Sequence, residues 1–220
     1  MKIKAIITGT TGMVGEGVLQ ECLSHQDVEE ILVINRRPCG VSHPKLTEII
    51  HSDFFNLSPV ADKLTGYNTC FFCLGVSSVG INEEQYYNLT YNLTMNFARL
   101  LAGQNPDMTF FYVSGAGTDT TEKGRMSWAR VKGKTENDLM KLPFKTVFAC
   151  RPGFMLPSEG AKNVPGYYKV FRYLYPVLRS VFPNHVSTLK EVALAMINSA
   201  IYGYEKQILE VKDLVQLAKR

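Results

Sequence analysis

The chain has 220 residues, of which 45% are hydrophobic and 20% are charged, with 24 basic against 20 acidic side chains. This composition is ordinary for one soluble globular domain and argues against a disordered, collagen-like or membrane-spanning protein, because no apolar run approaches the roughly 18 residues of a transmembrane helix. The net charge of +4 is too small to indicate nucleic acid as a ligand, although it suits a ligand that carries phosphate.

The five cysteines are odd in number, and the chain starts in a strand pattern rather than in the apolar stretch of a signal peptide. These features predict reduced thiols and a cytoplasmic protein. Cys70 and Cys73 have the C-x-x-C spacing, but they lie in an apolar run without a second pair, which favours packed thiols over redox chemistry. The four histidines are scattered, which argues against a metal site.

Apolar, strand-like runs alternate with helical patterns from the start of the chain to about residue 150. Strands are expected at 3–8, 31–35, 46–51, 69–74, 109–114 and 146–150, and helices at 14–25, 82–102 and 126–140. Continuous apolar strands separated by amphipathic helices are typical of a parallel sheet that is covered on both faces. The expected fold class is therefore α/β, a doubly wound parallel sheet with right-handed crossovers.

The character changes after residue 153. The stretch 167–179 mixes aromatic and basic residues, with Pro165 before it and Pro176 inside it. It fits either a helix that roofs the substrate pocket or a surface helix that docks onto a membrane or a partner.

Farther on, a helix is expected over 187–201, with Thr188 and Glu191 as a capping box, then a strand near 208 and a helix from 213. No linker separates this part of the chain from the rest. Residues 1–220 are thus expected to form a single domain, in which 151–220 is a short C-terminal extension on the substrate side.

A glycine-rich segment, Thr8-Gly9-Thr10-Thr11-Gly12-Met13-Val14-Gly15, lies between the first strand and the first helix. Gly9 permits the tight turn, Gly12 lets the backbone approach a pyrophosphate, and Gly15 lets the helix pack close to the sheet. The helix N-terminus offers free N–H groups and a partial positive charge to the anion. Because the segment opens an alternating α/β chain, it predicts a dinucleotide-binding turn.

The spacing Gly-x-x-Gly-x-x-Gly resembles that of the short-chain dehydrogenase/reductase superfamily, whose members bind NAD(P)H on a Rossmann fold. Within it, the chain is similar to the short atypical members, especially the Tat-interactive oxidoreductase-like group. The resemblance runs over most of the chain. Its other marks are Asn35-Arg36-Arg37, Asp53-Phe54, Cys73-Leu74-Gly75, Val131-Lys132-Gly133 and Arg151-Pro152-Gly153.

The end of the second strand bears on the choice of cofactor. NAD enzymes usually place a carboxylate there on the adenosine ribose, whereas this chain has Asn35 followed by Arg36 and Arg37. A carboxylate would repel a 2′-phosphate, and guanidinium groups can clamp it. NADP(H) is therefore expected in preference to NAD(H); the alternative is a solvated pair of arginines.

The resemblance implies further cofactor contacts. Asp53 matches the family's adenine-contacting acid, although it fits a cap or turn residue as well, and the segment 151–153 matches the one that lines the nicotinamide end. The expected cofactor-binding residues are Gly9, Thr11, Gly12, Met13, Val14, Gly15, Asn35, Arg36, Arg37, Asp53, Phe54, Leu74, Gly75, Lys132, Arg151, Pro152 and Gly153.

The superfamily's dehydrogenases use a serine, a tyrosine and a lysine, the last two spaced i, i+4 on one helix face. Trp128 and Lys132 fit that spacing, with tryptophan where tyrosine is expected. An indole N–H donates a hydrogen bond but cannot act as an acid near neutral pH. Ser114 is the expected serine, with Thr118 as the alternative, and Lys132 is expected to bind the nicotinamide ribose.

Three functions remain open on these residues. The first is an NADP(H)-dependent reductase whose acceptor is a flavin, a quinone or a reactive carbonyl, oriented by the protein without an acid from the missing tyrosine. The second is a non-catalytic NADP(H)-binding regulator or interaction module. The third, a sugar-nucleotide epimerase or dehydratase, is disfavoured because that chemistry relies on the tyrosine. A homodimer or a protein partner is also possible, and no metal or nucleic acid is expected.

Overall fold

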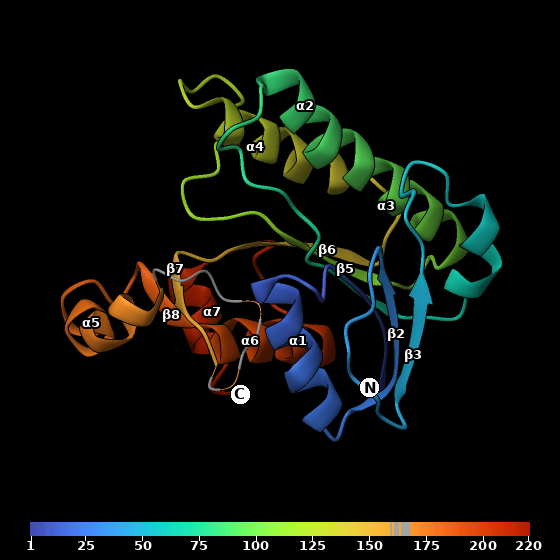
Figure 1. Cartoon of the computed structure of the whole chain (residues 1–220), viewed down its shortest axis with the longest axis horizontal. Helices are drawn as coiled ribbons and strands as arrows, with labels where there is room; N and C mark the ends of the chain where they lie inside the picture. Colours follow the sequence, from blue (N-terminus) through green and yellow to red (C-terminus); the bar gives the residue numbers. More distant parts are fainter. Residues whose placement is uncertain (159, 161–162, 164–167) are drawn as a thin grey trace.

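Seven parallel strands form one sheet, in the order β3-β2-β1-β4-β5-β6-β9 (Figure 1). The structure is a computed structural model that describes residues 1–158, 160, 163 and 168–220. The strands are β1 Ile3–Thr8, β2 Val28–Asn35, β3 Leu46–Ile50, β4 Thr69–Phe72, β5 Thr109–Val113, β6 Thr146–Arg151 and β9 Ile208–Glu210. The strand order reverses between β1 and β4, which is where ligands bind in doubly wound sheets. The expected α/β Rossmann fold is confirmed.

Helices cover both faces of this sheet (Figure 1). One face carries α1 Met13–Ser24, α6 Leu189–Tyr202 and α7 Val211–Leu217; the other carries η1 Ser58–Leu64, α2 Glu83–Tyr87, η2 Asn88–Asn92, α3 Leu93–Gln104 and α4 Ser127–Leu139. Neighbouring residues of a strand serve opposite faces: Ile7 and Phe71 pack with α1 and α6, while Ile6 and Phe72 pack with α3. The doubly covered sheet explains why its strands are continuously apolar.

The helix that was expected over 82–102 is more complex than its pattern predicts. Asn82 caps α2 by accepting a hydrogen bond from the backbone N–H of Gln85 at 2.8 Å. The turn η2 is π-helical and leads directly into α3, which ends at Gln104. A π turn inserts one extra residue into a continuous helix, and the sequence pattern predicted only the helix and not this insertion.

The C-terminal part adds to the same sheet through β9, which pairs with β6. Thr188 and Glu191 form the expected capping box, with contacts of 3.0 and 2.7 Å. Two short strands that the sequence did not predict, β7 Phe154–Leu156 and β8 Val186–Thr188, pair with each other. Helix α5 spans Tyr168–Val181 and contains Pro176, whereas Pro165 and Tyr167 lie outside the described residues.

Candidate functional site

The turn between β1 and α1 has no room for side chains at two of its glycines. Gly9 has a φ of +72°, and a Cβ there would lie 2.7 Å from the carbonyl oxygen of Cys73. A Cβ on Gly15 would lie 2.2 Å from the carbonyl oxygen of Gly9. Glycine at these positions therefore lets the turn fold tightly against the ends of β1 and β4.

Gly12 differs from the other two glycines because its free side faces open space. It is the N-cap residue of α1, and no side chain caps the helix within the described residues. A Cβ on Gly12 would meet nothing closer than the carbonyl oxygen of Gly9, at 3.4 Å. The first-turn N–H groups of α1 thus remain available to an anion, which is the arrangement that a pyrophosphate requires.

A cavity of about 320 Å³ opens beside this helix start, at the carboxyl edge of the sheet. It brings together residues from five separate segments of the chain. Seven of them were expected site residues: Gly12, Met13, Val14, Gly75, Ser114, Lys132 and Pro152. The other five were not singled out for the site: Cys73, Val76, Val113, Gly115 and Met155.

A smaller cavity, of about 140 Å³, lies toward β2 and β3. Its lining residues are Arg36, Ser52, Asp53, Phe54, Phe55, Leu74, Val76, Leu89 and Leu93. Val76 lines both cavities, so they adjoin at the loop that follows β4. We call the two cavities together the groove, and we name them after the parts of the cofactor that the sequence predicts there: the nicotinamide end (the larger) and the adenine end (the smaller).

The two arginines at the adenine end are exposed. Neither Arg36 nor Arg37 makes a hydrogen bond or an ion pair with any residue that the structure describes, and of the two only Arg36 lines the cavity. An unpaired guanidinium at the rim of a cavity is free to bind an anionic group of a ligand.

The Asn35 side chain, which is expected among the cofactor-binding residues, contacts the turn between β1 and α1. It is buried below the phosphate turn, where Oδ1 accepts from the N–H of Thr10 at 3.2 Å and Nδ2 donates to Thr10 Oγ1 at 2.5 Å. Nδ2 also lies 3.3 Å from Oε1 of Glu48 on β3. Asn35 therefore supports the turn from beneath. The position of Asn35 next to the two arginines in the sequence could not reveal this contact.

The loop after β3 forms the floor of the adenine end. Asp53 Oδ1 accepts hydrogen bonds from the N–H groups of Phe55 at 2.9 Å and Asn56 at 3.3 Å. Asp53 is therefore a turn residue, which was the alternative to an adenine contact, and it also lines the cavity. The Phe54 side chain is in the core. Asn96 of α3, which the sequence did not single out, fixes this loop by donating to the Phe54 and Phe55 carbonyl oxygens at 2.9 and 3.1 Å.

At the nicotinamide end, Lys132 projects from α4 and its Nζ donates to the backbone carbonyl oxygen of Ser114. Burial lowers the pKa of Lys132, and the Glu136 carboxylate one turn along the helix opposes that shift. Trp128 lies one turn before Lys132, as expected, but it does not line the cavity. Its ring lies 3.5 Å from the position that a Cβ on Gly117 would occupy.

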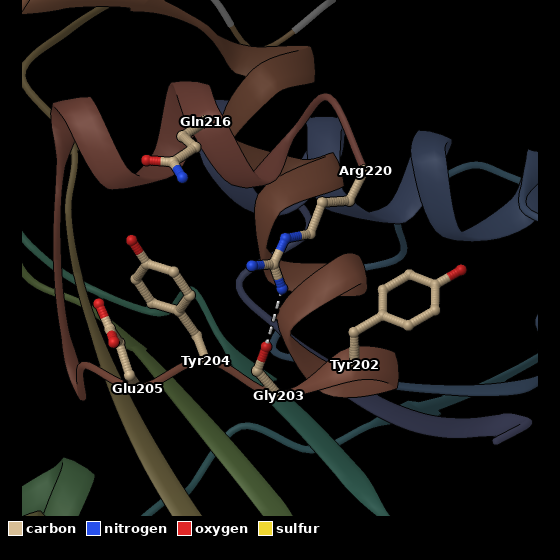
Figure 2. A pocket seen from close by; sticks show the side chains of 6 residues that line it. All are labelled: Tyr202, Gly203, Tyr204, Glu205, Gln216 and Arg220. Carbon is tan, nitrogen blue, oxygen red and sulfur yellow. Dashed lines mark hydrogen bonds between the residues drawn. The ribbon is translucent and has the colours of Figure 1, made fainter.

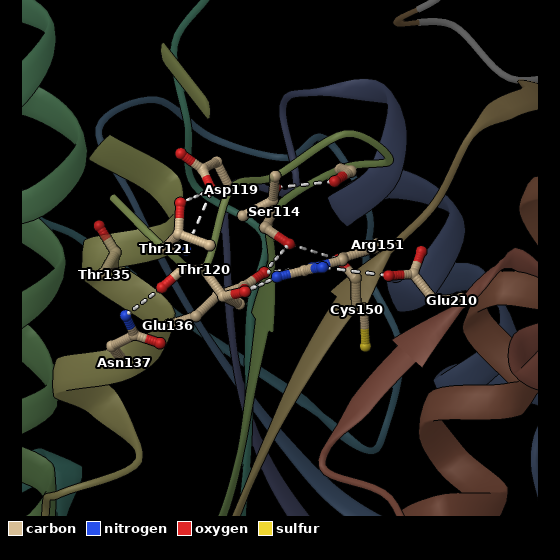
Figure 3. A network of polar contacts seen from close by, with 12 residues as sticks. Ser114, Asp119, Thr120, Thr121, Thr135, Glu136, Asn137, Cys150, Arg151 and Glu210 are labelled. Carbon is tan, nitrogen blue, oxygen red and sulfur yellow. Dashed lines mark hydrogen bonds and ion pairs between the residues drawn. The ribbon is translucent and has the colours of Figure 1, made fainter. Parts of the chain in front are cut away.

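Ser114, which lines the larger cavity, and Arg151, which does not, belong to one buried network (Figure 3). The Ser114 hydroxyl lies 2.5 Å from Glu136 Oε1. Arg151 donates to both Glu136 carboxylate oxygens, at 3.1 and 2.5 Å, and to Glu210 at 3.1 Å. These contacts differ from the expected substrate and cofactor contacts, because burial requires each charge to have a partner inside the protein. The sequence signal for Glu136 was only its place one turn after Lys132.

The remaining expected residues near this end have packing roles as well. The Thr118 hydroxyl donates to the Gly115 carbonyl oxygen at 2.8 Å. A Cβ on Gly153 would lie 2.2 Å from the His185 carbonyl oxygen, so glycine lets β7 and β8 approach each other. None of the described α5 side chains lines the cavity, and the role of this helix as a roof stays a prediction.

All five cysteines are free thiols. Burial raises the pKa of the Cys73 thiol to about 12, and it raises the pKa of Cys22, Cys70 and Cys150 as well. A neutral thiol is a poor nucleophile, and this supports packing over redox chemistry for the C-x-x-C pair.

Another pocket, of about 420 Å³, lies at the C-terminal end of α6 (Figure 2). Arg220 donates to the Gly203 carbonyl oxygen at 3.3 Å, and its guanidinium lies over the Tyr204 ring, 5.5 Å from the centroid. No residue expected to bind cofactor lines it, so its larger volume does not make it the functional site.

Comparison with known proteins decides the family. Residues 5–125 match the model of the NAD dependent epimerase/dehydratase family, which is more than half of the chain. The chain belongs to this family. The matched region contains the phosphate turn and both arginines of the adenine end, and this family agrees with the expected short-chain dehydrogenase/reductase character.

Known relatives and solved structures agree with this family. The protein FMP52-1, mitochondrial, of Scheffersomyces stipitis is 23% identical over 99% of this chain and 100% of its own length. An ADP-L-glycero-D-manno-heptose-6-epimerase of Helicobacter pylori has a TM-score of 0.67 at 14% identity, over 99% of this chain and 81% of its own. A short chain dehydrogenase of Burkholderia cenocepacia in complex with NADP has a TM-score of 0.67 at 14% identity, over 98% and 92%. At these identities the structures show the shared fold.

The expected cytoplasmic location is wrong by this comparison, because FMP52 relatives from several fungi are named as mitochondrial proteins. Reduced thiols exclude only an oxidising compartment, so the cysteine pattern could not distinguish the two locations. Over the described ranges of this family member, no helix has the length and apolar character needed to cross a membrane.

Proposed function

We propose that this family member is an NADP(H)-dependent oxidoreductase that transfers hydride between the cofactor and a small acceptor, and that it acts in mitochondria as its relatives' names suggest. The observation that carries the proposal is the groove itself. Its two ends adjoin at Val76, with an unpaired Arg36 at one end and a half-buried Lys132 at the other. The uncapped start of α1 lines the larger of the two.

The residues present fit a dinucleotide along this groove. The N–H groups of α1 would hold the pyrophosphate, Arg36 would hold the 2′-phosphate, and Lys132 would hold the nicotinamide ribose. When bound, the cofactor supplies a hydride. The protein contributes proximity and orientation, because the apolar side chains of Met13, Val113 and Met155 exclude water from the acceptor's place.

Two measurements test this proposal. Calorimetry with NADPH and NADH should give tighter binding of NADPH, and loss of NADPH absorbance should follow the addition of a flavin, a quinone or an aldehyde. No heat with either nucleotide would contradict the proposal.

A second candidate function is a non-catalytic NADP(H)-binding regulator or interaction module. It is favoured by the position of Trp128, which brings no acid to the groove, and by the engagement of the Ser114 hydroxyl with Glu136. NADPH binding without turnover on a wide panel of acceptors, together with the recovery of a specific partner, would support this candidate against the oxidoreductase.

A further inference from the structure

The nicotinamide end contains one charged side chain. Among the residues that line it, all of them in the described part of the chain, Lys132 alone carries a charge. The Cys73 thiol is the other ionisable group there, and the remaining side chains are apolar or absent, apart from the Ser114 hydroxyl. The apolar side chains of the lining are Met13, Val14, Val76, Val113, Pro152 and Met155. Such a lining accepts an apolar compound with one polar atom directed at the amine.

Reduction of a carbonyl requires a proton as well as a hydride. Hydride addition to the carbon leaves an alkoxide, a much stronger base than the anion of a reduced quinone or flavin. A fixed acid therefore accelerates carbonyl reduction far more than reduction of the other two acceptors. Two groups near the site cannot supply it, because the Trp128 indole is not an acid and the Ser114 hydroxyl is directed at Glu136. The Cys73 thiol, whose pKa is raised to about 12 by burial, is a weaker acid than Lys132, whose pKa is lowered by burial.

We propose that Lys132 Nζ is the proton donor of this site, and that the substrate is an apolar carbonyl compound whose oxygen faces that amine. This inference rests on the proposed oxidoreductase function. In the step, bound NADPH would supply the hydride: its C–H bond would break to leave NADP⁺, a C–H bond would form at the carbonyl carbon, and the C=O π electrons would move to the oxygen. The oxygen takes a proton from the Lys132 ammonium, an O–H bond forms, and the neutral amine regains a proton from water.

The contacts of Lys132 suit this role. One N–H of the Lys132 ammonium donates to the carbonyl oxygen of Ser114, and the Ser114 hydroxyl is in turn bonded to Glu136. The other two N–H groups of the ammonium are free to face ligands. The titratable and charged groups that face the amine are Glu136 on its own helix, Arg151 from β6 behind that carboxylate, and Cys73 from the end of β4. Because burial lowers its pKa, Lys132 releases a proton more readily than a solvated lysine does.

The test compares two acceptors of similar size, hexanal and a benzoquinone, at saturating NADPH. Lys132→Arg keeps the positive charge but cannot release a proton, and Lys132→Met removes the charge. The matched control is Lys134→Met, on the same helix, where the amine pairs with Asp138 at 2.9 Å and does not line the cavity. NADPH fluorescence gives the affinity of each variant, so that binding and chemistry are separated.

We expect Lys132→Arg to reduce the rate with hexanal on the order of 10²–10⁴-fold more than the rate with the quinone, because any loss of the cofactor contact lowers both rates and only the aldehyde needs the proton. Equal losses with both acceptors would show that Lys132 only holds the cofactor, and would overturn the inference. If the wild type reduces the quinone but not hexanal, the substrate class is wrong while the oxidoreductase stands. If it reduces neither acceptor, the proposed function and the inference fail together.

A readout without turnover completes the test. With NADPH bound and no acceptor present, nitrogen NMR follows the Lys132 amine, assigned by the loss of its resonance in Lys132→Arg. Its titration midpoint should match the pH at which kcat/KM for hexanal falls, and the rate should fall as pH rises, because the donor must be protonated. A mismatch between the two midpoints would contradict proton donation by Lys132.

Discussion

The two ends of the groove are built in opposite ways. At the adenine end the charged groups are exposed: Arg36 has no partner among the described residues, and Asp53 is fixed only by its own turn. Behind the nicotinamide end the charges of Glu136 and Arg151 are buried and paired, since Glu136 is fully buried and contacts both Ser114 and Arg151. Solvent weakens exposed charges, whereas buried pairs are strongly held in one geometry.

This contrast separates two tasks. Exposed arginines can bind a phosphate that arrives with the ligand, and replacing them should alter affinity without altering the fold. A buried network keeps the Ser114 carbonyl oxygen, and hence Lys132, in one place, but damage to it affects the whole domain. On the proposed function, the adenine end would select the cofactor and the nicotinamide end would fix the chemistry.

The largest expected effect tests the buried end. Glu136→Ala leaves the Arg151 guanidinium buried with only Glu210 as a partner, so we expect a loss of about 3–5 kcal/mol in the free energy of unfolding by urea. The control is Glu83→Ala, which removes an exposed ion pair with Arg130 (2.7 Å) and should cost about 0–1 kcal/mol. Similar losses of unfolding free energy in the two variants would show that the buried network is no more important to stability than an exposed ion pair.

The glycine turn at the start of α1 gives the next effect. Gly12→Val places a side chain over the N–H groups of α1, and the loss of two contacts to a charged group should weaken NADPH binding by about 100-fold or more. Folding should persist, because the Cβ position is open apart from the Gly9 carbonyl oxygen at 3.4 Å. Calorimetry and circular dichroism measure the two results. The control is Gly103→Ala, at a position that is also in open space but lies on α3. An unchanged affinity of Gly12→Val for NADPH would refute the pyrophosphate site.

Arg36→Ala tests the exposed end alone. One charge-assisted contact contributes about 1.5–3 kcal/mol, so the Kd for NADPH should rise roughly 10- to 100-fold while the Kd for NADH changes little. Unfolding by urea should be unaffected. Arg37→Ala, equally exposed but outside the cavity, should have a smaller effect. Equal effects on both nucleotides would show that Arg36 does not bind the 2′-phosphate.

The sequence predicted the fold and the phosphate turn because both depend on local patterns. Apolar strands, the glycine spacing and the capping box at Thr188 follow from residues that are close together in the chain. Lys132 and the first-turn residues of α1, which are both expected to bind the cofactor, line one cavity, since carboxyl ends of parallel strands meet at one edge.

The sequence did not reveal contacts between distant segments. Asn35 faces Thr10, 25 residues away, and Asn96 holds a loop that precedes it by about 40 residues. Arg151 pairs with Glu136 and Glu210. In each case the residue type fits several roles, and only the packing decides between a ligand contact and an internal partner.

Trp128→Tyr should have the smallest effect, and it tests whether the nicotinamide end needs the missing tyrosine. Because Trp128 packs beside Gly117 and does not line the cavity, a phenol there should raise the rate with hexanal by no more than about tenfold, the contribution of one neutral hydrogen bond. Trp128→Phe, which removes the indole without adding a hydroxyl, separates this gain from repacking. A gain of several orders of magnitude would mean that this position reaches the reacting atoms, and that the acid comes from α4 one turn before Lys132.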